Sequence, residues 1–207
     1  MTTLVLARHG ETIWHADDRY AGSSDIPLTS LGERQALRLA DWASTADLRG
    51  VWSSDLVRAG RTAEPCAAAA GLTMRVDPRL REVDFGDAEG MNGEEIEARF
   101  PGAYQAFERD PIAHHLPGGE APDAATERAL TGLRDICTAQ PDGRVLVVGH
   151  GTLIRLVLCR YLGIPLEDYR RRFPTMRNCS LTEIRIIDDE AGVISFNETP
   201  MAETDRP

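Results

Sequence analysis

The chain has 207 residues, 42% hydrophobic and 27% charged, which fits one sizeable α/β domain, with or without a lid, whose core needs no disulfides. Its formal net charge of −10 argues against nucleic acid and anionic membrane surfaces as partners. It contains no lysine, which excludes a P-loop and a Schiff-base active site, whereas its arginines leave anion recognition possible.

The cysteines and the apolar segments indicate the compartment. No CxxC or zinc-ligand spacing occurs among the four cysteines, for which we expect reduced, buried thiols: Cys66, Cys137, Cys159 and Cys179. No apolar run approaches the roughly 20 residues that a membrane span requires, and the N-terminus lacks the basic region of a signal peptide. We therefore expect a cytoplasmic protein.

Taken in chain order, short apolar runs alternate with amphipathic stretches. Strands are predicted at 3–7, 50–53, 72–76 and 144–149, followed by a hairpin of 180–187 with 193–197. Helices are predicted at 30–45, 55–70, 92–100, 102–110, 123–138 and 151–162. The first of these helices opens with a capping-box pattern over 30–33, with Thr29 or Ser30 as the cap.

This order of elements predicts the fold class. Strands that alternate with helices favour an α/β fold with a mostly parallel sheet covered on both faces, here a single domain over residues 1–200. The segment 85–123 has predicted helices but no strand, and we interpret it as a lid over one edge of the sheet. Residues 201–207 are expected to form a disordered tail.

Side chains that carry chemistry follow the ends of the predicted strands. Arg8 and His9 follow the first strand, and Arg58 lies on the helix after the second. Glu82 comes a few residues after the third strand, and His150 comes directly after the strand at 144–149. Ligands of open α/β sheets bind just beyond the carboxyl ends of the strands, so we expect these five residues to meet.

Two imidazoles and two guanidiniums make a cationic site that suits a dianionic phosphate. The helix after His150 adds backbone N–H donors, beginning at Gly151. A neutral histidine can attack phosphorus, and nearby positive charges favour its neutral form. A carboxylic acid can then protonate the leaving alkoxide, for which Glu82 is the candidate.

These residues also carry a family resemblance. Five blocks, in order, resemble the histidine phosphatase superfamily in its phosphoglycerate-mutase-like branch: LVLARHGETIW, GSSDIPLTSLGERQA, WSSDLVRAGRTAE, LREVDFGDAEGMN and VLVVGHGTLIR. The resemblance spans most of residues 3–165 and implies a three-layer α/β/α sandwich with its active site at the strand ends. It further implies that His9 is the nucleophile and that Glu82 is the proton donor. Arg8, Arg58 and His150 would then bind the transferring phosphoryl group.

The sequence departs from the family pattern at positions that contact phosphate or substrate in relatives. His15 stands where the family commonly has Asn, and Ala21, just before Gly22, stands where it has Gln. We keep His15, Ala21 and Gly22 as candidate substrate-binding residues. The stretch VDFGDAEGMN lacks the Arg-His-Tyr-Gly of the mutases, and the middle of the chain is shorter than theirs. Both departures favour a phosphatase over a mutase.

The leading hypothesis is therefore a phosphatase for a small phosphorylated molecule, without cofactor or metal. The adjacent His114 and His115 have no carboxylate or cysteine at ligand spacing, which disfavours a metal site. A phosphoglycerate mutase is the alternative within enzymes, and a non-catalytic module that binds a phosphorylated ligand is the alternative of another class. The resemblance also allows a homodimer, although no residue of this chain argues for one.

Overall fold

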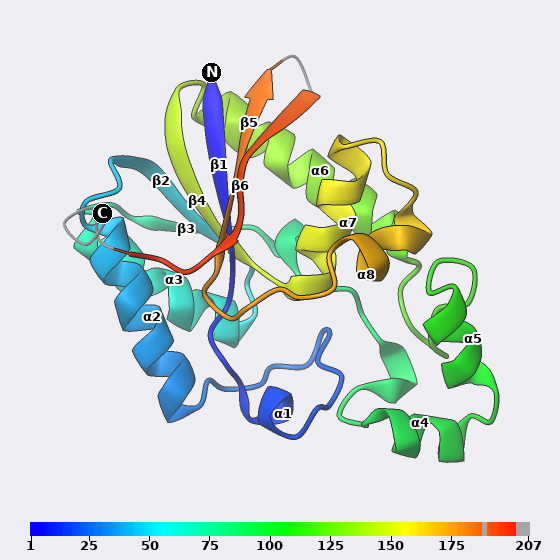
Figure 1. The fold of residues 1–207 in the computed structure, drawn as a ribbon. Coiled ribbons are helices and arrows are strands. Elements are labelled where there is room, and N and C mark those ends of the chain that lie inside the picture. Colours follow the sequence, from blue (N-terminus) through cyan, green and yellow to red (C-terminus); the bar gives the residue numbers. More distant parts are fainter. Residues whose placement is uncertain (188–189, 202–207) are drawn as a thin grey trace.

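A six-stranded sheet forms the centre of the molecule (Figure 1). The computed structural model describes residues 1–187 and 190–201. Its strands, in chain order, are β1 (Thr2–Arg8), β2 (Leu48–Ser53), β3 (Met74–Val76), β4 (Gly143–Gly149), β5 (Leu181–Ile187) and β6 (Glu190–Glu198). The strands lie in the order β3-β2-β4-β1-β5-β6. The first four pair in parallel and the last two are antiparallel, which confirms the predicted mostly parallel sheet.

Helices cover both faces of this sheet (Figure 1). They are α1 (Ile13–Ala16), α2 (Ser30–Ala43), α3 (Val57–Ala69), α4 (Gly93–Arg99), α5 (Ala103–Arg109), α6 (Pro122–Ala139), α7 (Gly151–Tyr161) and α8 (Tyr169–Arg172). Short 3₁₀ turns occur at η1 (Pro78–Leu80), η2 (Gly86–Ala88) and η3 (Leu166–Asp168). No helix among the described residues is both long enough and apolar enough to cross a membrane.

The alternation of side chains along β1 and β4 builds two separate cores. Leu4 and Val147 belong to one hydrophobic cluster, which includes buried residues of α6 and α7. Val5 and Val148 belong to the other, which includes buried residues of α2 and α3. Successive residues of a strand point to opposite faces, so a continuous apolar run fills both layers. The result is the expected three-layer α/β/α sandwich.

The segment 85–123 lies beside the sheet with α4 and α5 and contains no strand, as predicted (Figure 1). It is anchored more firmly than a loose flap, because Ile96, Phe107 and Leu116 are fully buried in the cluster that includes α6 and α7. The lid role and the single-domain boundary at 200 stay predictions.

The element boundaries differ from the predicted ones by a few residues. Helix α3 begins at Val57, two residues later than expected, and β6 is longer than the predicted strand at both ends. Thr29 is the cap of α2 and accepts a hydrogen bond from Gly32 N–H. The expected turn of the hairpin includes residues 188 and 189, which lie outside the described residues, as do residues 202–207 of the expected tail.

Three of the four thiols are buried as expected, but Cys137 is only partly buried. Burial raises the pKa of Cys66 to about 12 and that of Cys159 to about 11. Thiols with such pKa values remain protonated near neutral pH and are poor nucleophiles. Cys66 and Cys159 are therefore packing residues.

Candidate active site

The register of two neighbouring strands brings two histidines together. Arg8, the last residue of β1, pairs with Gly149, the last residue of β4, so His9 and His150 leave the sheet side by side. The centroids of their rings lie 5.1 Å apart, and the two residues are 2% and 0% exposed. The structure thus brings the two predicted histidines together at the carboxyl ends of parallel strands.

Hydrogen bonds define which nitrogen of His9 is free to react. The Nδ1 of His9 lies 2.7 Å from the carbonyl oxygen of Gly10, so Nδ1 carries the proton. The Nε of Arg58 donates to Nε2 of His9 over 3.2 Å, which requires a lone pair on Nε2. Burial, followed by the charges of His150, Arg58 and Arg8, holds the pKa of His9 well below its usual value. His9 is therefore a neutral imidazole with its lone pair on Nε2.

Arg58 is completely buried and fixed by main-chain oxygens. Its Nη1 donates to the carbonyl of Ser24 and its Nη2 donates to the carbonyl of Gly22, at 2.7 and 2.6 Å. Thr62 accepts a hydrogen bond from Gly10 N–H and donates one to the carbonyl of Arg58. These bonds tie the loop after β1 to helix α3. Arg58 is thus positioned by the fold and keeps its charge for an anion.

The loop after β1 can reach this position only because two glycines face each other. A Cβ on Gly10 would lie 2.6 Å from the carbonyl oxygen of Gly32, and a Cβ on Gly32 would lie 2.1 Å from that of Glu11. Glu11 accepts a hydrogen bond from Thr29, in keeping with a structural role for this acid. The start of α2 therefore supports the loop that carries His9.

His150 occupies the N-cap position of α7, but its side chain does not cap the helix. Its Nε2 lies 2.7 Å from the hydroxyl of Ser54, and its buried Nδ1 has no hydrogen-bond partner among the described residues. Burial and the charge of Arg58, in that order, hold the pKa of His150 well below its usual value. The ring is therefore neutral.

Arg8 reaches the same place from the end of β1. Its Nη1 donates to the carbonyl of Met176 over 2.5 Å, and its buried Nε has no hydrogen-bond partner among the described residues. Burial lowers the pKa of Arg8 to about 10, against the opposing effect of Glu82. Gly151 lets the guanidinium approach, because a Cβ there would lie 3.3 Å from Nε of Arg8.

Glu82 is buried against the start of α7. Its carboxylate accepts hydrogen bonds from the N–H groups of Thr152 and Leu153, both at 2.8 Å. Neither of the two arginines nearest in sequence forms a salt bridge with Glu82. Arg79 pairs with Asp77 and Asp135, and Arg81 pairs with Asp55. Glu82 thus accepts from two N–H groups that have no partner within helix α7, at the helix N-terminus that follows His150.

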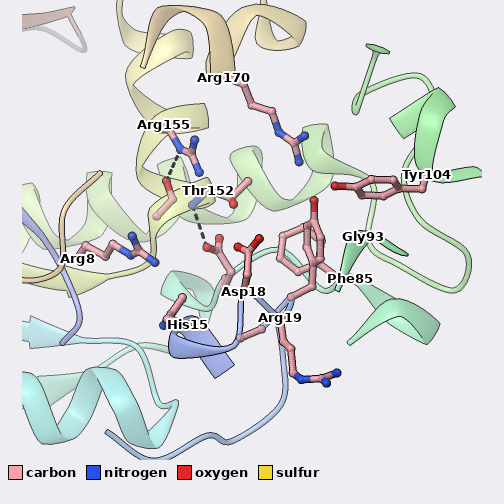
Figure 2. A pocket seen from close by; sticks show the side chains of 14 residues that line it. Arg8, His15, Asp18, Arg19, Phe85, Gly93, Tyr104, Thr152, Arg155 and Arg170 are labelled. Carbon is pink, nitrogen blue, oxygen red and sulfur yellow. Dashed lines mark hydrogen bonds between the residues drawn. The ribbon is translucent and has the colours of Figure 1, made fainter. Parts of the chain in front are cut away.

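A cavity of about 320 Å³ lies next to Arg8, Glu82 and Gly151, whereas His9, Arg58 and His150 are not among its lining residues (Figure 2). It is lined by Arg8, His15, Asp18, Arg19, Tyr20, Ala21, Glu82, Phe85, Gly93, Tyr104, Gly151, Thr152, Arg155 and Arg170. Two of the candidate substrate-binding residues, His15 and Ala21, therefore face the cavity. Gly22 does not line it: its carbonyl holds Arg58 from behind, and a Cβ there would lie 2.4 Å from the carbonyl oxygen of Val83.

His15 is held by a hydrogen bond between its Nδ1 and the hydroxyl of Thr12, at 2.8 Å. Burial, then the charges of Arg8 and Arg58, lowers the pKa of His15 to about 3. A third neutral imidazole therefore lies within 5.2 Å of His9, measured between ring centroids.

Three arginines that line the cavity were not among the predicted site residues: Arg19, Arg155 and Arg170. Arg155 lies one helical turn after Gly151, and that spacing is the signal that could have indicated it. Arg170 belongs to a run of three arginines, a pattern typical of a solvated helix face, but its guanidinium stacks on Phe107 at 4.5 Å and donates to the hydroxyl of Tyr169. Figure 2 shows Arg8, Arg155 and Arg170 extending toward the cavity from three different elements.

Arginines without an acidic partner lie in the cavity and beside it. In the part of the chain that the structure describes, Arg8, Arg58 and Arg155 form no ion pair with an acidic side chain. Within the same residues no cluster of three metal-ligating side chains occurs. The geometry suits an anion with several oxygen acceptors, and a phosphoryl group has that shape.

The comparisons with known proteins agree with this geometry. A family model for the histidine phosphatase superfamily (branch 1) matches residues 4–199. The chain belongs to the histidine phosphatase superfamily. A Cronobacter sakazakii protein named "Probable phosphoglycerate mutase GpmB" is 35% identical over 184 residues, 89% of this chain and 85% of that protein. This match confirms the resemblance to the phosphoglycerate-mutase-like branch.

Solved structures of the superfamily include phosphatases. A mycobacterial glucosyl-3-phosphoglycerate phosphatase in complex with VO3 superposes with a TM-score of 0.86 at 29% identity, over 95% of this chain and 99% of that one. The α-ribazole phosphatase of Shigella flexneri gives a TM-score of 0.85 at 27% identity, over 97% and 98%. Bacillus stearothermophilus YhfR gives 0.90 at 31% identity, over 96% and 98%. The chain is thus similar along nearly its whole length to phosphatases of this superfamily.

Proposed function

We propose that this protein is a phosphatase that hydrolyses a small-molecule phosphomonoester through a phosphohistidine on His9, without a metal ion. One observation carries the proposal: a neutral His9, with its lone pair on Nε2, accepts a hydrogen bond from Arg58 beside a cavity that other arginines line. A nucleophile for phosphorus and the positive charges that stabilise the transferring group are thereby combined.

In the first step, Nε2 of His9 attacks phosphorus and the bond from phosphorus to the leaving oxygen breaks. Arg8, Arg58 and His150 stabilise the negative charge on the equatorial oxygens, with the N–H of Gly151 at the start of α7. Glu82 gives its proton to the leaving alkoxide. The products of this step are the free alcohol and the phosphohistidine.

In the second step, water attacks phosphorus and the bond from phosphorus to Nε2 breaks. Glu82 takes the proton of that water, so His9 and Glu82 return to their starting states and inorganic phosphate leaves. The lining position of Glu82 supports this role.

The size of the cavity supports a small substrate. A volume of about 320 Å³ lies at the lower end of the range for ligand pockets. The similar phosphatases are named for a glucosylated phosphoglycerate and for α-ribazole phosphate esters, both small metabolites. We propose that the substrate is a cytoplasmic metabolite of the sugar-phosphate or phosphoglycerate type. We also propose that the protein has neither nucleic acid nor a membrane as a partner. A homodimer stays a prediction of the family resemblance.

The experiment is phosphate release from a panel of phosphomonoesters in the presence of EDTA. We expect EDTA-resistant release that His9→Ala abolishes. His114→Ala is the matched control, because His114 is an exposed histidine outside the cavity, and this variant should keep the wild-type rate. Loss of activity in EDTA, or full activity of His9→Ala, would contradict the proposal.

The name of the GpmB relative favours one second candidate, a phosphoglycerate mutase. A mutase returns the phosphoryl group to its substrate, whereas a phosphatase transfers it to water. Incubation with 3-phosphoglycerate distinguishes the two, because isomerised product without free phosphate would identify a mutase. The non-catalytic binding module predicts phosphate binding without turnover on every substrate, and the buried Glu82 argues against it since binding alone needs no acid.

A further inference from the structure

Ser54 is a buried hydroxyl in direct contact with the active site, and no role has been assigned to it above. It follows β2 and is 1% exposed. Its Oγ lies 2.7 Å from Nε2 of His150. The two residues are close because Ser54 follows β2 and His150 follows β4, and these two strands are neighbours in the sheet. This distance is that of a normal hydrogen bond, whose direction determines where His150 keeps its proton.

The surroundings of Ser54 give that direction. The N–H of Leu56 donates weakly to Oγ of Ser54, at 3.4 Å, so the oxygen already has one donor. No acceptor other than Nε2 of His150 lies within hydrogen-bond reach of the hydroxyl in the described residues. The Ser54 O–H therefore donates, and Nε2 is the unprotonated nitrogen. In a neutral ring the proton is then on Nδ1.

Nδ1 of His150 is the nitrogen that lacks a partner. It is buried, it has no hydrogen bond in the described residues, and its ring lies 5.1 Å from that of His9. A buried N–H without an acceptor is destabilising, and native proteins rarely retain one without a functional reason. An acceptor on the phosphoryl group bound at His9 would satisfy it.

We propose that Ser54 is a positioning residue that selects the Nδ1–H tautomer of His150, so that a neutral His150 donates a hydrogen bond to the transferring phosphoryl group. This inference rests on the proposed phosphatase function. The opposite tautomer would turn a lone pair toward the phosphoryl oxygens and repel them. A hydroxyl also rotates, so Ser54 can accept from Nε2–H if His150 gains a second proton beside the bound dianion.

The kinetic test compares two substitutions at Ser54 with one at Ser53. Ser54→Ala removes the hydroxyl, and we expect kcat to fall by about 10- to 100-fold, the usual loss for a residue that orients a catalytic group. Ser54→Thr keeps a hydroxyl on the same carbon and should restore most of the rate. Ser53→Ala is the matched control, because Ser53 is equally buried but bonds a main-chain carbonyl instead of His150. Equal rates in Ser54→Ala and Ser53→Ala would overturn the proposal.

The direct test reads the tautomer itself in the ligand-free protein. Long-range ¹H–¹⁵N spectra of histidine-labelled protein distinguish a protonated ring nitrogen from an unprotonated one, and His150→Gln identifies the signals of His150. We expect Nδ1–H in the wild type and in Ser54→Thr, and a mixture of tautomers in Ser54→Ala. An Nε2–H ring in the wild type, or the same tautomer in all three proteins, would overturn the proposal.

The two tests also separate this inference from the proposed function. The tautomer is measured without substrate, so it does not depend on turnover. If the tautomers are as expected but the protein releases no phosphate, only the phosphatase proposal is contradicted. If phosphate release requires His9 but His150 carries its proton on Nε2, only the Ser54 proposal is contradicted.

Discussion

The Nε of Arg58 donates to Nε2 of His9 across 3.2 Å, so a guanidinium occupies the lone pair of the atom expected to attack phosphorus. The other guanidinium nitrogens are fixed by the carbonyls of Ser24 and Gly22. An arriving phosphoryl group needs only to insert between the two side chains, with the arginine already directed at its oxygens. Such preorganisation avoids reorientation of dipoles during the reaction.

Arg58→Lys tests this arrangement, since it keeps the charge and removes the fork of donors. A lysine ammonium cannot bond both carbonyls and the phosphoryl group in the same geometry. We expect kcat/KM for phosphate release to fall by at least about 100-fold, the effect of losing one preorganised donor. Arg61→Lys, at an exposed position of the same helix, should stay near the wild-type value. A small effect at Arg58 would mean that charge alone suffices.

Gly32→Ala is expected to damage both stability and activity. The added methyl group would lie 2.1 Å from the carbonyl oxygen of Glu11, so the loop that carries His9 would have to move away from α2. Gly60→Ala is the matched control, because a Cβ at Gly60, inside α3, meets nothing within 4 Å. Thermal unfolding should show a lower Tm for Gly32→Ala. For Gly60→Ala it should show a higher Tm, corresponding to a gain of up to about 1 kcal/mol in the free energy of unfolding. Equal behaviour of the two variants would contradict this packing argument.

Stability should fall as the pH drops below about 6.5, the ordinary pKa of histidine. Burial lowers the folded-state pKa of His9, His15 and His150, so the unfolded chain binds protons that the folded chain does not. Stability is then complete above pH 6.5 and is lost at lower pH, by about 1.4 kcal/mol per pH unit for each fully neutral ring.

Denaturant unfolding between pH 7 and pH 5 measures this slope. His15→Asn removes one of the three rings and should reduce the slope by about one proton, since the pKa of His15 is lowered to about 3. A slope that His15→Asn leaves unchanged would show that His15 is already protonated in the folded protein at pH 5.

The sequence predicted the fold and the inner site because both depend on local patterns. Continuous apolar runs identify strands buried on both faces, and the residues after such strands meet at one edge of a parallel sheet. His9 and His150 were found in this way, and the register of β1 with β4 explains why they meet. The order of the strands did not follow from the sequence, since it depends on long-range packing.

The outer cavity was harder to predict than the inner site. Arg170 follows no strand and lies among three consecutive arginines, which resemble a solvated helix face; only the neighbouring Phe107 and Tyr169 reveal its position. Gly22 was expected at the substrate, whereas its carbonyl holds Arg58. Contacts between segments distant in sequence decide such positions, and a single sequence does not contain them.

Arg155 leads to a prediction about the leaving group of the substrate. Its Nε donates to the carbonyl of Gly151 at 3.0 Å, and its guanidinium lies 5.2 Å from the ring of Tyr169 and lines the cavity. Burial lowers its pKa, and it has no acidic partner among residues 1–187 and 190–201. A buried guanidinium without an acidic partner favours a substrate that has a second anionic group beside the phosphate.

Arg155→Gln should therefore reduce kcat/KM for 3-phosphoglycerate by about 10- to 100-fold more than for p-nitrophenyl phosphate, the range expected for one lost hydrogen bond to a charged group. Arg160→Gln is the matched control, because Arg160 lies on the same helix but is exposed and pairs with Glu127 at the surface. Kinetics on both substrates separate two roles for Arg155. Equal losses on the two would mean that it acts on the phosphoryl group or on the structure of α7, whereas a loss confined to the carboxylate-bearing ester would place it at the leaving group.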